Sequence, residues 1–312
     1  MACLACSWRI DLIASAEEWN CTSTEGNFTR TNDCMSTEIE VSGDLTIVGA
    51  NGESSGALTT LYAADSYSRH FTLDGQFTLH IKWLRLTGGN VSKVTTVVKD
   101  KEGGAFFMHS GGGHFKAEFC SIINNIAVSG GGISARPNAG LALSQVTLYH
   151  TNVTGNTATH FGGGMRLNAH SDITKTQLKV TITGGVIKDN VAIAGKGGGG
   201  GMLVHNRVTI NITGTQFIGN NATNCNGGGM MIKAGSTVRL NDVFFFDNRA
   251  ELKGGGVYFE NSNADYATLD MTGVVLERNI VMEAGANVNW GGGGLYLLYR
   301  VRAVLRECSF IK

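Results

Sequence analysis

The sequence lacks an excess of charge of either sign, a long apolar run and a signal peptide. Its 25 basic and 25 acidic residues balance, so the composition implies neither a polyanion nor a membrane surface as a partner. No run of about 20 apolar residues is present that could cross a bilayer as a helix. Residues 1–20 lack the basic start and apolar core of a signal peptide. Either a signal has been removed or the sequence starts late, and we expect no membrane span in this segment.

Signatures of cofactor and metal chemistry are also missing. The eight histidines show no recurring metal-ligand spacing. No Gly-Lys-Ser/Thr follows the glycine runs, which precede strand patterns rather than helices, so they are not phosphate loops. No basic stripe interleaved with aromatic residues indicates nucleic acid. The sequence therefore predicts no cofactor, no metal site and no nucleic-acid partner.

What the sequence does contain is a repeated phrase. An apolar residue lies three positions before an asparagine, a small residue follows that asparagine by two, and a glycine run and an apolar-x-apolar triplet come next. The spacings between successive asparagines are 31, 34, 30, 28 and 31 residues. The six asparagines are Asn125, Asn156, Asn190, Asn220, Asn248 and Asn279. A period in this range predicts a repeat architecture.

Each repeat contains three short pieces in which apolar and polar residues alternate, as in half-buried strands. Around the fourth asparagine the apolar positions of these pieces are Ile210 and Ile212, Phe217, and Met230 and Ile232. Three such strands cannot bury their apolar sides alone, but stacked coils enclose one continuous core. We therefore predict an all-β fold, a right-handed parallel β-helix with three faces per coil, whose handedness follows the parallel-crossover rule. About nine or ten coils at ~4.8 Å each give a rod of roughly 45 Å.

The asparagine and the glycines have physical roles in such a coil. At a sharp corner an asparagine side chain tolerates left-handed backbone and bonds locally. Stacked in register, the amides can bond from coil to coil, so we expect the six asparagines to form a ladder. Glycines allow tight turns and close approach of neighbouring coils. The 44 glycines in 312 residues are about twice the usual ~7%, and the corners explain the excess.

The pairing of a [FIVL]-x-x-N phrase with GGG-[MVIL] resembles the repeats of the polymorphic outer-membrane protein family, within the pectin-lyase-like β-helix superfamily. The resemblance covers roughly residues 100–312 and rests on six copies of the phrase. The family's GGA-[IVL] is best preserved at residues 103–106, and elsewhere a third glycine replaces the alanine. The resemblance implies a β-helix and a surface scaffold, because this repeat serves mainly as a scaffold in its relatives.

We expect an N-terminal cap segment at residues 1–37 and a β-helix at residues 38–312, with clear repeats from about residue 103. Residues 7–20 carry the one plausible helix. Its apolar face, which would cap the core, consists of Trp8, Leu12, Ala16 and Trp19. The chain stops at Lys312, one residue short of where a seventh asparagine is due. We therefore expect the β-helix to continue beyond residue 312 in a longer protein.

The seven cysteines fall into different settings. Cys21 and Cys34 lie close together near the predicted cap and could form a disulfide. An N-terminal C-x-x-C has no βαβ unit and no second C-x-x-C beside it, so redox or zinc chemistry is disfavoured. Cys120 and Cys308 fall two residues before the apolar anchor of the repeat, an inward position. We interpret them as small core residues.

Six N-x-[ST] sequons occur, at Asn20, Asn27, Asn90, Asn152, Asn211 and Asn221. Asn211 lies between two inward isoleucines and Asn152 precedes an inward valine, so both should face outward. None of the six is a ladder asparagine. We expect N-glycosylation at these sites, and therefore an extracellular or cell-surface protein of the secretory pathway.

Many β-helices of the superfamily cleave polysaccharides, and glycoside hydrolysis needs two carboxylates roughly 5–10 Å apart on one face. The outward row after the glycine runs contains no acid and consists of Phe107, Ser134, Arg166, Leu203, Met231, Tyr258 and Tyr296. The outward row before the ladder contains no acid pair and includes Lys188, Ile218, Phe246 and Glu277. Asp189 and Asp247 directly precede ladder asparagines and are interpreted as turn formers. We therefore predict no catalytic residue and no enzyme.

Two groups of outward residues are apolar. One slot in consecutive coils holds a stripe of Leu203, Met231, Tyr258 and Tyr296. A second patch lies before the ladder and consists of Ile218, Phe244 and Phe246. Such surface is either covered by a loop or terminus of the same chain or serves as an interface for a protein or, second, a glycan. Both alternatives stay open.

The sequence thus predicts a non-enzymatic extracellular or cell-surface scaffold or adhesin-like protein, as a subunit or segment of a larger assembly or filament. Protein partners or self-assembly are expected, with a glycan as a second option. The alternative function is a glycan-binding or polysaccharide-processing β-helix module. A groove lined by acids, or a bound sugar, would favour that alternative.

Overall fold

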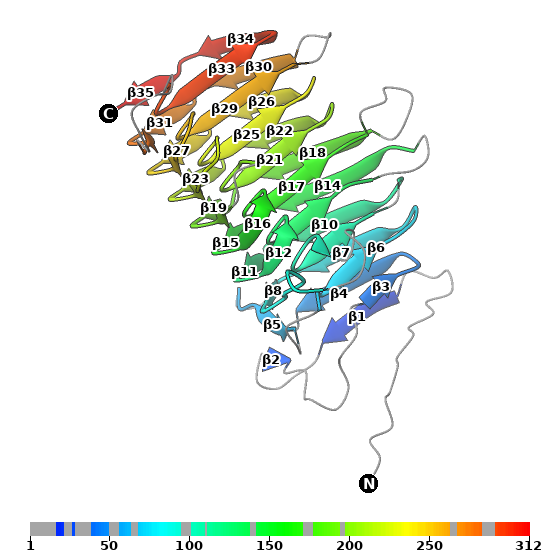
Figure 1. Cartoon of the computed structure of the whole chain (residues 1–312). Coiled ribbons are helices and arrows are strands. Elements are labelled where there is room, and N and C mark those ends of the chain that lie inside the picture. The colour runs from blue at the N-terminus through cyan, green and yellow to red at the C-terminus, as the bar shows by residue number, and fades with distance from the viewer. Residues whose placement is uncertain are drawn as a thin grey trace.

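The structure, a computed structural model, describes residues 17–21, 27–28, 39–49, 56–63, 68–94, 101–109, 111–137, 142–170, 177–193, 197–262, 267–282 and 291–312. Within these residues the chain is all-β and contains no helix (Figure 1). Every strand pairs in parallel with its counterpart in the neighbouring coil, and the coils stack along one axis. The protein is a parallel β-solenoid, which confirms the predicted fold class.

Two long sheets form adjacent faces of the solenoid. Sheet A consists of β1 (Glu17–Cys21), β4 (Leu45–Gly49), β7 (Thr78–Lys82), β10 (His114–Glu118), β14 (Ser144–Tyr149), β18 (Leu178–Thr183), β22 (Thr209–Thr213), β26 (Thr237–Asn241), β30 (Ala267–Thr272) and β34 (Val301–Arg306). Sheet B consists of β2 (Asn27–Phe28), β5 (Thr59–Tyr62), β8 (Leu84–Thr87), β11 (Ser121–Ile123), β15 (Asn152–Thr154), β19 (Val186–Lys188), β23 (Gln216–Ile218), β27 (Phe244–Phe246), β31 (Val275–Glu277) and β35 (Ser309–Ile311).

Two further sheets complete the coil. Sheet C consists of β3 (Ile39–Val41), β6 (Phe71–Leu73), β9 (Phe106–Met108), β13 (Ile133–Ala135), β17 (Met165–Asn168), β21 (Met202–His205), β25 (Met230–Lys233), β29 (Val257–Asn261) and β33 (Leu295–Tyr299). Sheet D is short and consists of β12 (Ile126–Ser129), β16 (Thr157–Phe161), β20 (Val191–Ala192), β24 (Asn221–Ala222), β28 (Arg249–Ala250) and β32 (Ile280–Val281).

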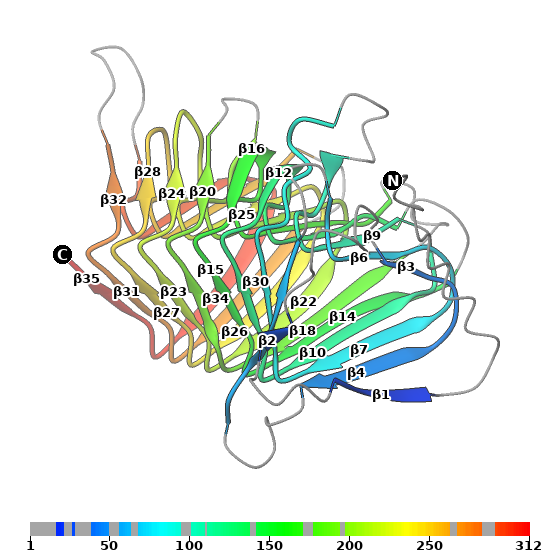
Figure 2. The ribbon, with the colours of Figure 1, turned by 90° about the horizontal axis from the view of Figure 1, so that it is seen from below.

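Sheet D gives the coil a feature that the sequence did not predict. Six successive coils of the described chain, from β10–β13 to β30–β33, contain all four sheets in the order A, B, D, C. Figure 2 shows sheet D standing out from the body of the solenoid, next to the corner where sheet B ends. We call sheet D, with the segments that lead from it to the glycine runs, the fin. Sheets A, B and C correspond to the three predicted strand pieces.

Inward residues of sheets A, B and C form one continuous core from Val41 to Leu276. The alternation predicted from the sequence holds, for example at Val180 and Ile182 of β18, which are buried between half-buried or exposed neighbours. Aromatic rings stack inside from coil to coil, such as Phe217 on Phe245 with centroids 4.7 Å apart. Cys120 is buried in this core, and burial raises the pKa of its thiol to about 12. Its interpretation as a core residue is confirmed.

The asparagine ladder forms as predicted. Each Nδ2 donates to Oδ1 of the asparagine one coil further, at 3.0, 3.1, 3.0, 2.9 and 2.8 Å from Asn125 to Asn279. The same Nδ2 also donates to a backbone carbonyl, as from Asn220 to Ile187 at 2.8 Å. All six asparagines are buried. Every rung therefore satisfies its polar atoms inside the protein, which buried amides require.

Left-handed backbone marks the corners, although not at the asparagines. The residue directly before each ladder asparagine has a positive φ, including Asp189 and Asp247 at 52° each. Their interpretation as turn formers is therefore confirmed. None of the six ladder asparagines has a positive φ, so the expected left-handed asparagine is wrong. The asparagine instead lies just past the bend, where its amide points inward and can stack.

The glycine runs allow neighbouring coils to approach each other closely. Gly162 has a φ of 61°, and a Cβ there would lie 2.1 Å from the carbonyl oxygen of Met165. A Cβ on Gly163 would lie 2.2 Å from the carbonyl oxygen of Gly200 in the next coil. Backbone atoms cannot yield to such a clash as a flexible side chain can. The first glycine is thus needed for the turn and the second for coil packing.

The N-terminal segment differs from the prediction. Residues 17–20, expected to be helical, lie in β1, which pairs in parallel with β4. The helix predicted at residues 7–20 is therefore wrong in this part, and residues 7–16 lie outside the described residues. Four apolar residues at helical spacing are a weak signal, and pairing to an existing sheet overrides it. Through β1 and β2, sheets A and B extend into the segment predicted as a cap.

Candidate functional site

The outer face of sheet C contains the row in which the sequence predicts an apolar stripe. The register matches the prediction, with Arg166 opposite Leu203, which is followed by Met231, Tyr258 and Tyr296 in successive coils. The side chains are not exposed, however. Leu203, Met231 and Tyr258 are only 2, 3 and 3% exposed and form a cluster with Phe161 of the fin. The apolar stripe is therefore present, but the interface alternative is wrong for these three residues.

The fin supplies the cover. A Cβ on Gly198, in the segment that returns from sheet D, would lie 2.3 Å from Sδ of Met231. A Cβ on Gly291 would lie 2.2 Å from the ring of Tyr296, which is half-buried. The absence of a side chain lets the returning segments lie directly on the apolar row. Of the two readings that the sequence left open, coverage by the same chain holds here.

The same row is polar in the two coils before Leu203, where it holds Ser134 and Arg166. Glu102 is 1% exposed and lies where the fin meets sheet C. Its carboxylate accepts hydrogen bonds from Ser134 at 2.9 Å, Arg136 at 2.9 Å and Arg166 at 2.7 Å. Arg69 donates to the backbone carbonyl of Glu102 at 2.5 Å. One buried acid thus connects residues from successive coils, an arrangement that we call the Glu102 clamp.

The second predicted patch lies on the outer face of sheet B and stays partly accessible. Phe244 and Phe246 are half-buried, with ring centroids 5.5 Å apart. The guanidinium of Arg278 lies 3.9 Å from the ring centroid of Phe246. Asp247 holds Arg278 through two hydrogen bonds of 3.0 and 2.7 Å. The Arg278–Asp247 ion pair thus lies beside the patch, and its role as an interface stays a prediction.

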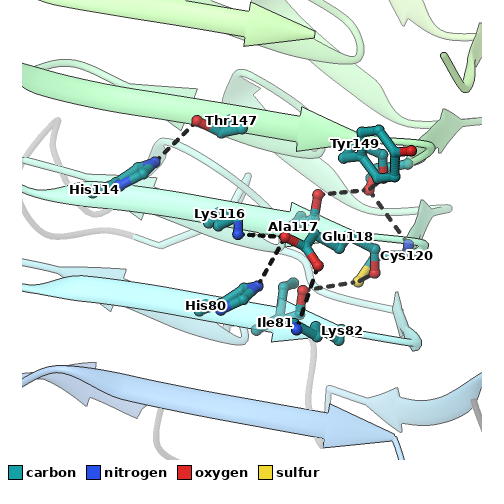
Figure 3. Close-up of polar contacts among 11 residues, drawn as sticks. His80, Ile81, Lys82, His114, Lys116, Ala117, Glu118, Cys120, Thr147 and Tyr149 are labelled. Atoms are coloured by element: carbon teal, nitrogen blue, oxygen red, sulfur yellow. Dashed lines mark hydrogen bonds and ion pairs between the residues drawn. The ribbon is translucent and has the colours of Figure 1, made fainter. Parts of the chain in front are cut away.

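A polar cluster that the sequence analysis did not predict lies on the outer face of sheet A (Figure 3). Strands β7 and β10 bring His80, Lys82 and Lys116 around the carboxylate of Glu118. His80 Nε2 lies 3.4 Å and Lys82 Nζ 3.5 Å from Glu118, and Lys116 also forms an ion pair with it. In the next strand pair, Nε2 of His114 lies 3.0 Å from the hydroxyl of Thr147. The cluster is half-buried on an open sheet.

The charges of this cluster set its protonation. Partial burial opposes ionisation of Glu118, but the hydrogen bond and charge of Lys116, with His80 and Lys82, lower its pKa overall. Burial, then the positive charge of Lys116, lowers the pKa of His80 despite the opposing effect of Glu118. Burial and Lys116 also lower the pKa of His114. At neutral pH the cluster therefore presents an anionic carboxylate and two neutral imidazoles beside the lysine side chains.

Aromatic rings line the corner between this cluster and sheet B. Trp83 stacks on Phe119 with centroids 4.4 Å apart, and Phe119 stacks on His150 at 5.6 Å. These three residues occupy the same left-handed corner position, with φ of 53°, 53° and 43°. Tyr149, at the end of β14, is 40% exposed and meets Phe119 edge to face at 5.2 Å. Polar groups and rings thus lie side by side on one surface.

The geometry does not provide an acid pair for glycoside hydrolysis on this face. Among the sheet A strands whose side chains the structure describes, β4 to β34, the outward acids are Glu118 in β10 and Asp270 in β30. These strands are five positions apart in sheet A, which at ~4.8 Å per strand is about 24 Å. Hydrolysis needs a separation of roughly 5–10 Å. The arrangement on this face can bind polar groups but lacks that pair.

The described sequons differ in exposure. Asn152 is exposed and Asn211 is half-buried on the outer face of sheet A, so both point outward as predicted. Asn221 is half-buried, and Asn90 accepts hydrogen bonds from the backbone and hydroxyl of Ser92 at 3.1 and 2.7 Å. Glycosylation itself stays a prediction. The side chains of Asn20 and Asn27, and Cys34 of the predicted Cys21–Cys34 disulfide, lie outside the described residues.

The sequence did contain a signal for the sheet A cluster. The pattern His-x-Lys occurs twice, at His80–Lys82 and at His114–Lys116, and the second copy continues to Glu118. Alternation places all of these residues on one face of their strands. The first copy lies in a coil before the asparagine phrase, where the register could not be read from the repeat, whereas the second lies in the coil of Asn125. The Glu102 clamp gave no such signal, because Glu102 lies in a connecting segment.

Among the described residues, no group of three or more His, Cys, Asp or Glu side chains is placed to hold a metal ion. No helix long and apolar enough to cross a membrane occurs in the part of the chain that the structure describes. Comparison of the sequence and structure with family models, curated proteins and solved structures gives no match. The functional argument therefore rests on the geometry of this chain.

Proposed function

We propose that this chain is a non-enzymatic structural scaffold of an extracellular or cell-surface assembly, adhesin-like and built on a repeat of the polymorphic outer-membrane protein type. We infer a right-handed winding from the crossover rule for parallel strands. The observation that carries the proposal is the unbroken ladder from Asn125 to Asn279, whose rungs are all buried and bonded. It holds the coils in one register, so that surface groups keep fixed positions along a stiff rod.

The proposed partner is another protein or a second copy of the chain. The half-buried rings of Phe244 and Phe246 on sheet B support this, because they offer apolar area next to the Arg278–Asp247 ion pair. Apolar patches with a polar rim are typical of protein contacts. The outward position of the exposed sequon at Asn152 supports a secretory route.

Electron microscopy of the native assembly tests the scaffold proposal. We expect rods joined through the sheet B face, with sugar density at the outward sequons. Mass spectrometry before and after enzymatic deglycosylation supplies an independent readout of the sequons. Free rods without partner contacts, together with unmodified sequons, would contradict both the assembly and its location.

A glycan-binding module is the second candidate, and the sheet A cluster favours it. Sugars are bound by hydrogen-bonding groups beside aromatic side chains, which Glu118, Lys116 and Tyr149 offer together. A glycan array, followed by calorimetry on any hit, tests this candidate. Tyr149→Ala should weaken binding about tenfold or more, since losing a buried contact of this size costs about 1–3 kcal/mol. Tyr62→Ala is a matched control, because Tyr62 is 45% exposed on sheet B. Equal binding by both variants would remove the candidate.

A further inference from the structure

The polar end of the sheet C row carries more cationic groups than its one carboxylate neutralises. Arg136 and Arg166 donate through Nη1 to the same oxygen, Oε1 of Glu102, at 2.9 and 2.7 Å. One buried negative charge therefore faces two guanidinium groups. Burying charge is costly unless it is paired. The clamp would be more stable with a further anion beside it.

Unused hydrogen-bonding capacity points the same way. Nε of Arg166 is buried and has no hydrogen-bond partner among the described groups. Only 11% of the side chain is exposed, so most of it is shielded from solvent. Nδ1 of His109 is also buried without a partner. His109 directly follows Met108, whose carbonyl accepts the backbone N–H of Arg136, so His109 and Arg136 are neighbours across two coils. An arginine offers no acceptor, so this corner has donors to spare.

The arginines are held in place and one of them can be reached. The guanidinium of Arg166 lies 5.0 Å from the ring centroid of Phe161, and the rings of Phe107 and His109 are 5.6 Å apart. The side chain of Arg136 is 40% exposed. A planar guanidinium fixed against a ring is well suited to bidentate bonding to an oxyanion. Solvent can reach the corner through Arg136.

We propose that Arg136, Arg166 and His109 form a binding site for a small oxyanion of the phosphate, sulfate or carboxylate class. The anion accepts hydrogen bonds from the N–H groups of Arg136 that Glu102 does not use and from Nε of Arg166. It neutralises the positive charge left over in the clamp. A water molecule could accept one of these bonds but would leave the charge in place. The site is independent of the proposed scaffold function.

Isothermal titration calorimetry of the intact chain tests the site. Inorganic phosphate, sulfate and acetate are titrated separately at constant ionic strength maintained with chloride. We expect saturable binding of one anion per chain, and the preferred anion identifies the oxyanion class. Arg136→Gln should weaken binding at least about tenfold, because a charge-assisted hydrogen bond is lost. Lys233→Gln, in the same sheet and already paired with Glu260, should leave binding within about twofold of wild type, because no bond to the anion changes.

Two results would overturn the proposal. The first is no saturable binding of any of the three anions by the wild-type chain. The second is wild-type affinity in a folded Arg136→Gln variant. If Arg136→Gln fails to fold, His109→Leu takes its place, since it removes the imidazole whose Nδ1 would bond to the anion and leaves both arginines on Glu102. Unchanged affinity in a folded His109→Leu variant would then count against the site.

Discussion

The outer row of sheet C has a polar end and an apolar end. The backbone register is continuous through both, and only the side chains differ. Ser134 and Arg166 occupy the row in two coils, and Leu203 and Met231 occupy it in the next two, in continuous register. Ser134 and Leu203 are both almost fully buried beneath the fin. The solenoid thus fixes the position and the cover of each slot, while the side chain decides how the slot is stabilised.

The two ends therefore respond differently to change. In the apolar end, each side chain stabilises the fold through the area that it removes from water and through packing. These contributions are largely independent of one another. In the polar end, the buried carboxylate of Glu102 is favourable only while its cationic partners are present. Removing one member leaves the others buried and unpaired. The polar end should be the more fragile of the two.

The largest effect is expected for Glu102→Ala. It leaves Arg166 buried without its counterion, which costs about 3–5 kcal/mol of unfolding free energy. Urea unfolding followed by circular dichroism measures the loss. Glu277→Ala is the control, because Glu277 is half-buried on the outer face of sheet B and should cost under about 1 kcal/mol. Equal losses in the two variants would show that the clamp is not an energetic unit.

Met231→Ala tests the apolar end. Removing a buried methionine side chain costs about 2–5 kcal/mol, depending on how far the cavity collapses. The Gly198 segment lies directly on Met231 and can settle into the space, so we expect a loss of about 2–3 kcal/mol. Ile218→Ala, half-buried on sheet B, should lose less in the same unfolding experiment. If Ile218 lost as much as Met231, the cover by the fin would be in doubt.

His205 lies where the two ends meet, and it makes the junction sensitive to acid. Burial, then the positive charges of Lys233 and Arg166, lowers the pKa of His205 to about 4. His205 therefore binds a proton less readily in the native state than in the unfolded state. Its contribution to the free energy of unfolding is fully present above the unfolded pKa of about 6.5 and is lost as pH falls toward 4. The loss should reach about 2–3 kcal/mol.

Unfolding free energies of wild type and His205→Gln, measured from pH 7 to pH 4, isolate this contribution. The variant should lose less stability over that range. His160→Gln is the control, since His160 is exposed on the fin, and it should follow the wild-type curve. Parallel curves for wild type and His205→Gln would contradict the assignment.

The smallest effect is expected when the polar end is converted to the apolar chemistry of its neighbour. In the double variant Glu102→Leu, Arg166→Leu, the buried Glu102–Arg166 ion pair is gone, and Arg136 is free to turn to solvent. Arg69 keeps its hydrogen bond, because its acceptor is the backbone carbonyl of residue 102. Replacing a buried ion pair by apolar residues is often neutral, so stability should stay within about 2 kcal/mol of wild type. The double variant should thus unfold at higher urea than Glu102→Ala. The reverse order would show that packing, not charge, dominates the clamp.

Much of this architecture could be predicted from the sequence, because the repeat carries it. The ladder asparagines, the strand pieces and the register of the row from Phe107 to Tyr296 follow from one phrase and the two-residue period of strands. These features depend on the local sequence pattern and on the stacking of equivalent residues in neighbouring coils. A regular repeat therefore fixes them without knowledge of the loops.

The remaining features depend on segments that the repeat does not describe. Most strands of sheet D are only two residues long, such as β24, too short for any periodic signal. Burial of Met231 depends on a fin segment whose length differs between coils. His80 lies in a coil before the asparagine phrase, where the register could not be read, so its approach to Glu118 could not be predicted. Trp19 has helical spacing from its apolar neighbours, yet pairing with β4 places its backbone in a strand.

The account depends most on the ladder, and urea unfolding of Asn220→Ala tests it directly. Asn220 donates two buried hydrogen bonds from Nδ2 and accepts two at Oδ1, so its loss should cost about 3–4 kcal/mol. Asn241→Ala, exposed on the outer face of sheet A, should cost under about 1 kcal/mol. Asn206→Ala should fall between them, since one bond to Asn168 and a left-handed backbone are affected. That order confirms the register of the coils, and equal costs for Asn220 and Asn206 would contradict it.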